Sequence, residues 1–320
     1  MRALCLLALA AALPVSAQSR TETGFTLLRL DTSARTAALA GTGAVATDDP
    51  AVLLSNPALL TPAASRGLGL GYTNLALDVS AGSAVYARDV GWLGGLSLGG
   101  GVRYLSYGDF ERRADLESDA QGTFGASEAA VTLAASREVL PRVRAGVATH
   151  VVFASLDDAG SQALAADLGV SYTNDDEGLV LGASVHHVGG VLSSLGSSTD
   201  RLPLDVRLTA SKRLRYVPLT VSVAAVDLQR FEGQASDSSF VGRALDHLSL
   251  GGELQLGSAL RARAGYNGRR GADLRSGGRL DLAGVSVGAG VALRRVSVDY
   301  AFSNWGAFGG LHQFGVRTRF

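Results

Sequence analysis

Long runs in which apolar and polar side chains alternate recur through most of this 320-residue chain. In one run, Leu164, Leu168 and Val170 alternate with Asp167 and Gly169. Successive side chains of a β-strand point to opposite faces, so each run predicts a strand with one apolar and one polar face. Many runs extend over roughly ten residues, whereas strands of soluble domains centre on about five or six. Tilted strands that cross a membrane need roughly nine to eleven residues, so the run length favours a membrane barrel.

The connections between these runs alternate between short and long. We expect strands at 67–74, 79–88, 92–107, 127–138, 142–155, 162–174, 178–190, 202–214, 217–228, 245–257, 259–268, 279–293, 295–304 and 311–320. Every second connection is a tight turn, and most of the others are long, as at 108–126, 229–244 and 269–278. Short periplasmic turns and long external loops are typical of outer-membrane barrels, whereas a soluble β-sandwich has no reason to sort its loops. The sequence therefore predicts an all-β fold, a transmembrane antiparallel β-barrel of about 14 strands over 67–320.

The first residues, 1–17, have the organisation of a signal peptide. The basic start Met1-Arg2 precedes an apolar run to Leu13 and the small-residue site Val15-Ser16-Ala17. The run is too short for a membrane-spanning helix, which needs about 20 residues. We expect cleavage after Ala17, export, and a final location in the outer membrane. The single cysteine, Cys5, lies in this segment, so no disulfide or cysteine metal site is expected in the exported chain.

The chain ends in an amphipathic run with an aromatic last residue. Phe314, Val316 and Phe320 share one parity, and Gln313 and Arg317 share the other. A terminal strand of this kind is the feature by which the outer-membrane assembly machinery recognises barrels. Phe320 is therefore the candidate residue for barrel assembly.

Charged side chains within the runs fall on the parity opposite the apolar residues. The clearest examples are Arg103, Arg144, Asp167, Asp205, Arg207, Glu253 and Asp299. An Arg or Lys on the lipid face near the midplane costs about 2–4 kcal/mol, so these side chains are expected inside the barrel. The chain also has 41 glycines, and glycines on the inner face would let other backbone approach closely. A barrel of about 14 strands is too wide for its own side chains to fill, so it either holds a plug or conducts water.

Residues 18–66, between the signal peptide and the first strand, do not alternate, and we expect them to form a plug in the lumen. Asp49-Pro50 and Asn56-Pro57 each combine an N-cap residue with proline at the first helical position, which predicts two short helical turns. Arg35 is expected near Asp48 or Asp49. A mobile periplasmic linker is the alternative, but the segment is more apolar than disordered linkers are.

Short motifs in this plug segment resemble a known family. In chain order they are Ser33-Ala34-Arg35, Ala38-Leu39-Ala40-Gly41, Asp48-Asp49 and Asn56-Pro57-Ala58-Leu59-Leu60. This order is similar to that near the N-terminus of the PorV/PorQ family, whose barrels are distantly similar to the fatty-acid-transporting FadL barrels. The resemblance continues through Tyr107-Gly108-Asp109-Phe110 to His312-Gln313-Phe314 and favours the PorQ branch. The motif residues are the candidate site in the plug.

The resemblance implies a component of the type IX secretion system, which exports proteins across the outer membrane and attaches them to the cell surface. In that family the PorQ branch is a non-enzymatic barrel that anchors a PorZ-like surface protein, in a complex with a PorV-like barrel and a PorU-like sortase. A partner of this kind would dock on the long loops at 108–126, 229–244 and 269–278. The charges of these loops would pair with the partner or with outer-membrane lipid, unless the loops are simply solvated.

Two other functions stay open at this point. The Asn56-Pro57-Ala58 motif in the plug also favours a FadL-like transporter of a hydrophobic small molecule. A lumen without a filled interior would make the barrel a plain diffusion pore.

Neither the charge balance nor any motif predicts an enzyme or a cofactor site. The chain has 29 basic and 29 acidic residues, so its charge does not indicate a nucleic-acid partner. We expect no serine-hydrolase elbow of the G-x-S-x-G kind. The five histidines, His150, His186, His187, His247 and His312, do not repeat a metal-motif spacing. His186 and His187 are adjacent on a predicted strand, so their side chains are expected on opposite faces and unable to bind one ion. We therefore predict no metal site.

Overall fold

The structure is a computed structural model that describes residues 24–43, 47–75, 78–113, 119, 121–195, 200–230, 240–274, 282–306 and 309–320. The predicted signal peptide, 1–17, and the first predicted plug residues, 18–23, lie outside the described residues. The same is true of 114–118, 231–239 and 275–281, which include part of the charge of the three long loops.

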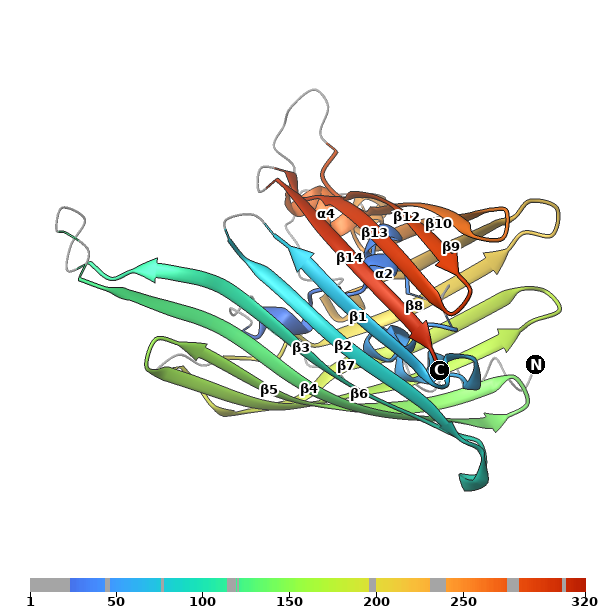
Figure 1. Ribbon diagram of the computed structural model, residues 1–320, viewed down its shortest axis with the longest axis horizontal. Coiled ribbons are helices and arrows are strands. Elements are labelled where there is room, and N and C mark those ends of the chain that lie inside the picture. Colours follow the sequence, from blue (N-terminus) through green and yellow to red (C-terminus); the bar gives the residue numbers. More distant parts are fainter. Residues whose placement is uncertain are drawn as a thin grey trace.

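Fourteen antiparallel strands form a closed barrel, in which each strand pairs with its neighbours in the sequence and β1 pairs with β14 (Figure 1). The strands are β1 Gly67–Asn74, β2 Ser80–Val90, β3 Leu96–Glu111, β4 Thr123–Leu140, β5 Val143–Leu156, β6 Ala159–Asn174, β7 Leu179–Ser193, β8 Asp205–Arg213, β9 Leu219–Ala225, β10 Leu248–Leu256, β11 Leu260–Asn267, β12 Val285–Leu293, β13 Val296–Asn304 and β14 Gly310–Arg319. The register of β1 and β14 runs from Gly67↔Arg319 to Asn74↔His312 and closes the barrel. The predicted fold class is confirmed.

The strand predicted from residue 92 begins later than expected, at Leu96. Residues Gly91–Leu93 instead form a 3-10 turn, η5, and Gly94 and Gly95 follow it with φ of 72° and 75°. Glycine adopts this left-handed conformation without a steric penalty, so the two glycines turn the chain before β3 can start.

Two of the predicted loops contain short helices. Helix α3, Phe240–Asp246, starts in the loop predicted at 229–244 and includes the first two residues of the strand predicted at 245–257, so β10 begins later, at Leu248. Helix α4, Gly268–Asp273, starts at the last residue of the strand predicted at 259–268 and continues into the loop predicted at 269–278. The side chain of Asn267 accepts a hydrogen bond of 2.8 Å from the backbone N–H of Arg270, which caps α4 at its start.

The outward face of the barrel is apolar, as the alternation predicts. Leu133 and Val102 expose 66% and 52% of their surface, whereas their chain neighbours Thr132 and Arg103 are buried. Large exposed apolar side chains recur on all sides of the barrel, and a band of this kind is a surface for lipid. The barrel is therefore a transmembrane one. Separately, the described helices include none that is long and apolar enough to cross a membrane.

The two ends of the barrel differ in their connections. Short turns, such as the one at Pro141 and Arg142 between β4 and β5, lie at the end where β1 begins and β14 finishes. The long connections between β7 and β8, β9 and β10, and β11 and β12 lie at the opposite end. The predicted sorting of the loops is confirmed for most connections. Three connections at the long-loop end are nevertheless short, those between β1 and β2, β5 and β6, and β13 and β14.

The chain before β1 runs inside the barrel, against the inward faces of the strands (Figure 1). It contains short helical turns at η1 Thr26–Leu28, α2 Ala34–Ala38, η2 Pro50–Leu54, η3 Pro57–Leu59 and η4 Pro62–Ala64. We call residues 24–43 and 47–66 the plug. Leu27 of the plug packs with Leu105 and Val152 of the wall, and Leu60 packs with Val85.

Glycines on the inner face make room for the plug. A Cβ atom on Gly146 of β5 would lie 2.4 Å from the backbone nitrogen of Ala58. A Cβ atom on Gly169 of β6 would lie 2.0 Å from the side-chain oxygen of Asn56. Contacts this short are not tolerated, so any larger residue at either position would displace the plug. The predicted role of the inward glycines is confirmed at these sites.

Candidate functional site

The two predicted helical turns of the plug start at their predicted caps. The side chain of Asp49 accepts a hydrogen bond of 2.9 Å from Ala51 N–H, and that of Asn56 accepts one of 2.9 Å from Ala58 N–H. Proline follows each cap at the first helical position, where the backbone N–H has no partner within the helix, so its absence costs no hydrogen bond. Turn η4 starts in the same way at Thr61, a signal that is equally visible in the sequence.

Helix α2 ends within the Ala38-Leu39-Ala40-Gly41 motif. The N–H of Gly41 donates to the carbonyl of Thr36 at 2.9 Å, and Ala40 and Gly41 have φ of 55° and 80°. This is the Schellman arrangement, in which left-handed residues satisfy the last carbonyls of a helix.

Small residues let α2 lie directly on the wall. Ser33 occupies the N-cap position, and Ala34 and Ala38 pack against Ala301 of β13. The motifs Ser33-Ala34-Arg35 and Ala38-Leu39-Ala40-Gly41 thus form the start and the end of a helix that packs closely against the barrel wall.

Arg35 of α2 joins the plug to the wall through a bidentate ion pair. Its Nε and Nη2 atoms each lie 3.0 Å from a carboxylate oxygen of Glu253 on β10. Its Nη1 atom lies 2.9 Å from Asp48, so the predicted proximity to Asp48 is confirmed. Bidentate pairs of this kind fix geometry as well as charge.

The ion pairs continue along the wall. Arg263 lies 2.7 Å from Glu253 and 2.6 Å from Asp299 of β13. Arg317 of β14 lies 3.3 Å from Asp299 and 3.4 Å from Asp49. We call these residues the plug–wall network, and its members are Arg35, Asp48, Asp49, Glu253, Arg263, Asp299 and Arg317. Every charge in it has an opposite partner.

The two plug aspartates of this network respond to it in opposite ways. The side chain of Asp48 is half exposed, and the charges of Arg35 and Arg317 hold its pKa at about 2. For Asp49 burial is the stronger effect, and it raises the pKa despite Arg317 and Arg35. Asp48 therefore stays ionised throughout the physiological range.

The Asn56-Pro57-Ala58 motif contacts a different part of the wall. The side-chain amide of Asn56 donates to the carbonyl of Ala183 on β7 at 3.3 Å. The hydroxyl of Ser171 on β6 donates to the carbonyl of Ala58 at 2.8 Å. Pro57 rests on Gly146. The motif therefore holds the plug to β5, β6 and β7.

A cavity of about 400 Å³ lies between the plug and the long-loop end of the barrel. Small-molecule sites typically occupy about 300–1,000 Å³, so the volume suits a ligand. Its apolar lining consists of Leu28, Leu30, Ala40, Ala51, Leu54, Val226, Leu274 and Trp305. Its charged lining consists of Arg29, Arg103, Arg207, Arg269, Arg270, Asp31, Asp205, Asp227 and Asp273.

Three of the five cavity arginines are in ion pairs. Arg29 and Arg269 lie 3.1 Å and 3.0 Å from Asp227. Arg207 pairs with Asp205. These charges are neutralised within the protein.

Arg103 and Arg270 differ from the other three. Neither guanidinium has a carboxylate oxygen of the described residues within 4.0 Å, so neither forms an ion pair with them. Arg103 is only 5% exposed and donates one bond, of 3.3 Å, to the carbonyl of Leu27. The guanidinium of Arg270 lies 4.9 Å over the ring of Trp305, and burial lowers its pKa. Each of the two arginines has a buried nitrogen without a hydrogen-bond partner in the described structure, so an anion in the cavity would satisfy both.

Asp31 of the plug lines the same cavity. Burial raises its pKa to about 6, although the backbone N–H of Ser33 and the charges of Arg207 and Arg270 act in the opposite direction. Near neutral pH the cavity therefore contains one carboxylate that protonates readily.

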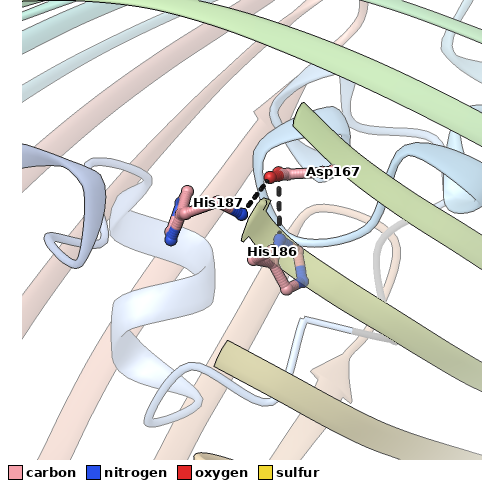
Figure 2. A group of neighbouring side chains, drawn as sticks. All are labelled: Asp167, His186 and His187. Carbon is pink, nitrogen blue, oxygen red and sulfur yellow. Dashed lines mark hydrogen bonds and ion pairs between the residues drawn. The ribbon is translucent and has the colours of Figure 1, made fainter. Parts of the chain in front are cut away.

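His186 and His187 both face the lumen, so the prediction that they lie on opposite faces is wrong (Figure 2). Both line the cavity. The register of β6 and β7 shifts between Ala166↔Val188 and Leu168↔Val185, and His187 has a left-handed φ of 59°. This β-bulge adds a residue to β7 and breaks the period of two at this point.

Asp167 of β6 is the centre of the histidine cluster. One carboxylate oxygen accepts a hydrogen bond of 2.9 Å from Nδ1 of His186 and lies 3.0 Å from Nε2 of His150. The other oxygen accepts a bond of 2.8 Å from the backbone N–H of His187 (Figure 2). His187 Nδ1 lies 2.9 Å from the carbonyl of Pro203.

A series of hydroxyl, imidazole and carboxylate groups passes through this cluster. The hydroxyl of Ser184 lies 2.8 Å from Nε2 of His186, whose Nδ1 contacts Asp167. The order Ser–His–Asp is that of a hydrolase triad. Ser184 is buried, however, and it does not line the cavity, so its hydroxyl is not presented to a molecule bound there.

The G-x-S-x-G letters occur twice, around Ser97 and Ser286. Ser97 lies in β3 and Ser286 in β12, and each of these strands leads into another strand. A nucleophile elbow needs a sharp turn from a strand into a helix. The prediction that the chain lacks this motif is therefore wrong, although neither occurrence lies on a strand-to-helix turn.

The predicted site residues divide into three groups in the structure. Arg35, Asp48 and Asp49 meet in the plug–wall network, and Asn56 to Ala58 contact β5 to β7. Phe320 is exposed at the short-turn rim, and its N–H donates to the carbonyl of Arg66 at 3.1 Å. The cavity arginines and the histidine cluster are not among the predicted site residues. They come together through strand pairing, which no local sequence motif predicts.

No protein-family model matches the sequence, and no curated protein is similar to it in sequence. Solved structures do share the fold. The toluene transporter TodX of Pseudomonas putida is similar over 93% of this chain and 97% of its own, with a TM-score of 0.58 and 14% identity. The fold is FadL-like.

Two further structures agree. A FadL homologue of Pseudomonas aeruginosa matches 90% of this chain and 98% of its own, with a TM-score of 0.54 and 11% identity. The monoaromatic hydrocarbon channel CymD matches 93% and 99%, with a TM-score of 0.54 and 13% identity. At such low identities the likeness establishes the FadL-like architecture alone.

Proposed function

We propose that this chain is an outer-membrane transporter for a small molecule with an apolar body and an anionic group. The observation that carries the proposal is the cavity beside the plug, which combines apolar side chains with two cations, Arg103 and Arg270, that lack a carboxylate partner among the described residues. The charge of Asp31 acts on both cations, but neither has a carboxylate in direct contact, and a ligand anion would supply that contact.

The position of the cavity supports transport rather than storage. It opens between the plug and the long-loop end, which faces the cell exterior in outer-membrane barrels. TodX and CymD, which share the fold, are a transporter and a channel for apolar molecules.

Uptake by cells tests this function. Cells without the chain would be compared with cells complemented by the wild type, using radiolabelled dodecanoate as the anionic probe and dodecanol as its neutral counterpart. We expect the deletion to slow dodecanoate uptake and the wild type to restore it. Uptake of dodecanoate that is unchanged by the deletion would contradict the proposal.

A matched pair of variants makes that test specific to the cavity. Complementation with Arg103→Gln/Arg270→Gln is expected to restore little dodecanoate uptake. Complementation with Arg142→Gln is expected to restore all of it, because Arg142 is exposed on a short turn, far from the cavity lining, and its ion pair is with the exposed Asp176.

The second candidate function is an anchor in type IX secretion, as the family resemblance implies. The plug–wall network favours it, because Arg35, Asp48 and Asp49 belong to the resembling motifs and tie the plug to the wall. A barrel whose lumen stays closed suits a scaffold for a PorZ-like surface protein, a PorV-like barrel and a PorU-like sortase. A plain diffusion pore is less favoured, because the plug occupies the lumen.

Affinity purification separates the two candidates. A tagged copy would be recovered from gently solubilised outer membranes of cells that are secreting cargo, and co-purified proteins identified by mass spectrometry. Recovery of the surface and sortase partners, together with loss of cargo attachment on deletion, would support the anchor. Recovery of the barrel alone with normal cargo attachment would exclude it.

A further inference from the structure

We propose that Asp167, His186 and His187 form a binding site for a divalent transition-metal ion, with Zn²⁺ as the representative ion. A carboxylate oxygen and one ring nitrogen from each histidine lie within 4.8 Å of one another. Two imidazoles and a carboxylate are the ligand set of many zinc sites that keep a position open. The inference concerns ion binding alone and does not depend on the transport function.

The backbone brings these groups together by a departure from regular strand geometry. Without the bulge in β7, His187 would point to the lipid face, as adjacent strand residues do. The bulge and the left-handed φ of 59° at His187 place it in the lumen beside His186 instead. A left-handed conformation at a non-glycine strand residue is sparsely populated, and such strain concentrates at binding sites.

Supporting groups orient the ligands. Ser184 contacts the ring nitrogen of His186 that faces away from Asp167, at 2.8 Å, and the carbonyl of Pro203 contacts His187. Metal-binding histidines usually make such a bond with their second nitrogen. The Ser184 hydroxyl can accept as well as donate, so the proton on Nδ1 of His186 can move to Nε2 when an ion binds at Nδ1.

Small adjustments complete the geometry. Zn–N bonds of about 2.0–2.1 Å place tetrahedral ligand atoms about 3.4 Å apart. The Nδ1 atom of His186 and the carboxylate of Asp167 are already 2.9 Å apart. The ring of His187, which borders the cavity, has to turn toward them (Figure 2). The fourth position of the ion would then face the cavity, because His186 and His187 both line it.

Metal binding to the purified full-length barrel tests the proposal. The protein would carry no histidine tag, would be stripped with a chelator in a non-ionic detergent, and would be titrated with Zn²⁺ alone. We expect about one Zn²⁺ per chain, retained in an excess of Mg²⁺, which prefers oxygen ligands. A wild type that binds no Zn²⁺ would overturn the proposal.

Two variants locate the ion. His187→Gln is expected to weaken Zn²⁺ binding by at least about tenfold, whereas His312→Gln is expected to leave it unchanged, because His312 lies on the outer face beside Tyr300. The gel mobility of unheated samples checks that each variant is a folded barrel. Equal Zn²⁺ affinity of the wild type and a folded His187→Gln would contradict the site, and His186→Gln repeats the test if His187→Gln does not fold.

Discussion

The plug meets the barrel in two contrasting ways. At the plug–wall network, three arginines and four carboxylates pair completely, and the arginine of the plug is bound to Glu253 in a bidentate geometry. At the cavity, Arg103 and Arg270 remain without an ion pair to any described carboxylate. The same residue type therefore holds the plug on one side and, in the proposed transporter, would bind the ligand on the other. We infer that the ion-paired arginines fix the plug and that the two arginines without an ion pair serve the proposed binding.

Breaking the fixed side should have the largest effect. Arg35→Met leaves Glu253 buried with one cation fewer, and removing one partner of a buried pair costs about 3–5 kcal/mol. We expect the free energy of unfolding to fall by this order in urea titrations of the refolded barrel. Arg142→Met is the control, because its exposed pair with Asp176 contributes about 0–1 kcal/mol. An equal loss of unfolding free energy in the two variants would show that the plug–wall network does not fix the plug.

Removing a cavity cation should weaken ligand binding more than it weakens the stability of the barrel. Arg103→Gln deletes a buried charge that has no ion pair among the described carboxylates, so we expect a smaller loss of stability than for Arg35→Met. Hydrogen bonds to charged groups contribute about 1.5–3 kcal/mol, so dodecanoate affinity should fall by roughly 10- to 100-fold. Equilibrium binding to the detergent-solubilised barrel measures this, and a large loss of stability with unchanged affinity would contradict the assignment.

Crowding the plug against β5 tests how closely it is fitted. Gly146→Ala places a Cβ atom 2.4 Å from the backbone of Ala58, and overpacking of this kind costs about 1–3 kcal/mol. Gly190→Ala on β7 is the matched control, because no atom lies within 4 Å of its added Cβ. Urea titration of both variants should show destabilisation only for Gly146→Ala, and an equal response would mean that the plug is not seated on β5.

The smallest expected effect is the pH dependence of anion binding. The pKa of Asp31 is about 6 in the folded protein, above its ordinary 3.8, so the native state favours the protonated form. The cost of burying the ionised form is present above about pH 6 and is relieved as the pH falls toward 3.8. One charge at about 4 Å in water contributes about 1 kcal/mol, so affinity for an anion should rise about fivefold on going from pH 7.5 to 5.

Asp31→Asn isolates this contribution from that of the other groups in the protein. Dodecanesulfonate is the suitable probe, since a sulfonate stays ionised over this range. We expect the wild type to gain more affinity on acidification than Asp31→Asn does. Identical pH profiles would show that Asp31 does not influence the ligand.

The barrel and the caps of the plug follow from local patterns, which is why the sequence predicts them. Alternation depends on neighbouring residues, and Asp49-Pro50 and Asn56-Pro57 act within three positions of themselves. The pairing of Arg35 with Asp48 is also nearly local. Its pairing with Glu253 spans 218 positions, and no local rule selects that partner among the inward charges.

The histidine cluster escapes prediction for a different physical reason. The period-two rule places His186 and His187 on opposite faces, and it fails because a bulge depends on how β7 pairs with β6. The adjacent histidine pair was the available signal. A bulge at that pair is decided by tertiary pairing rather than by the residues alone.

The most direct test of the central claim is a crystal structure of the barrel with 12-bromododecanoate. Anomalous scattering from bromine locates the probe, and the electron density shows the plug. The account predicts bromine in the cavity, the carboxylate in contact with Arg103 or Arg270, and an unchanged plug–wall network. Bromine outside the cavity, or a plug displaced from Glu253 while the two arginines remain without an anion, would contradict it.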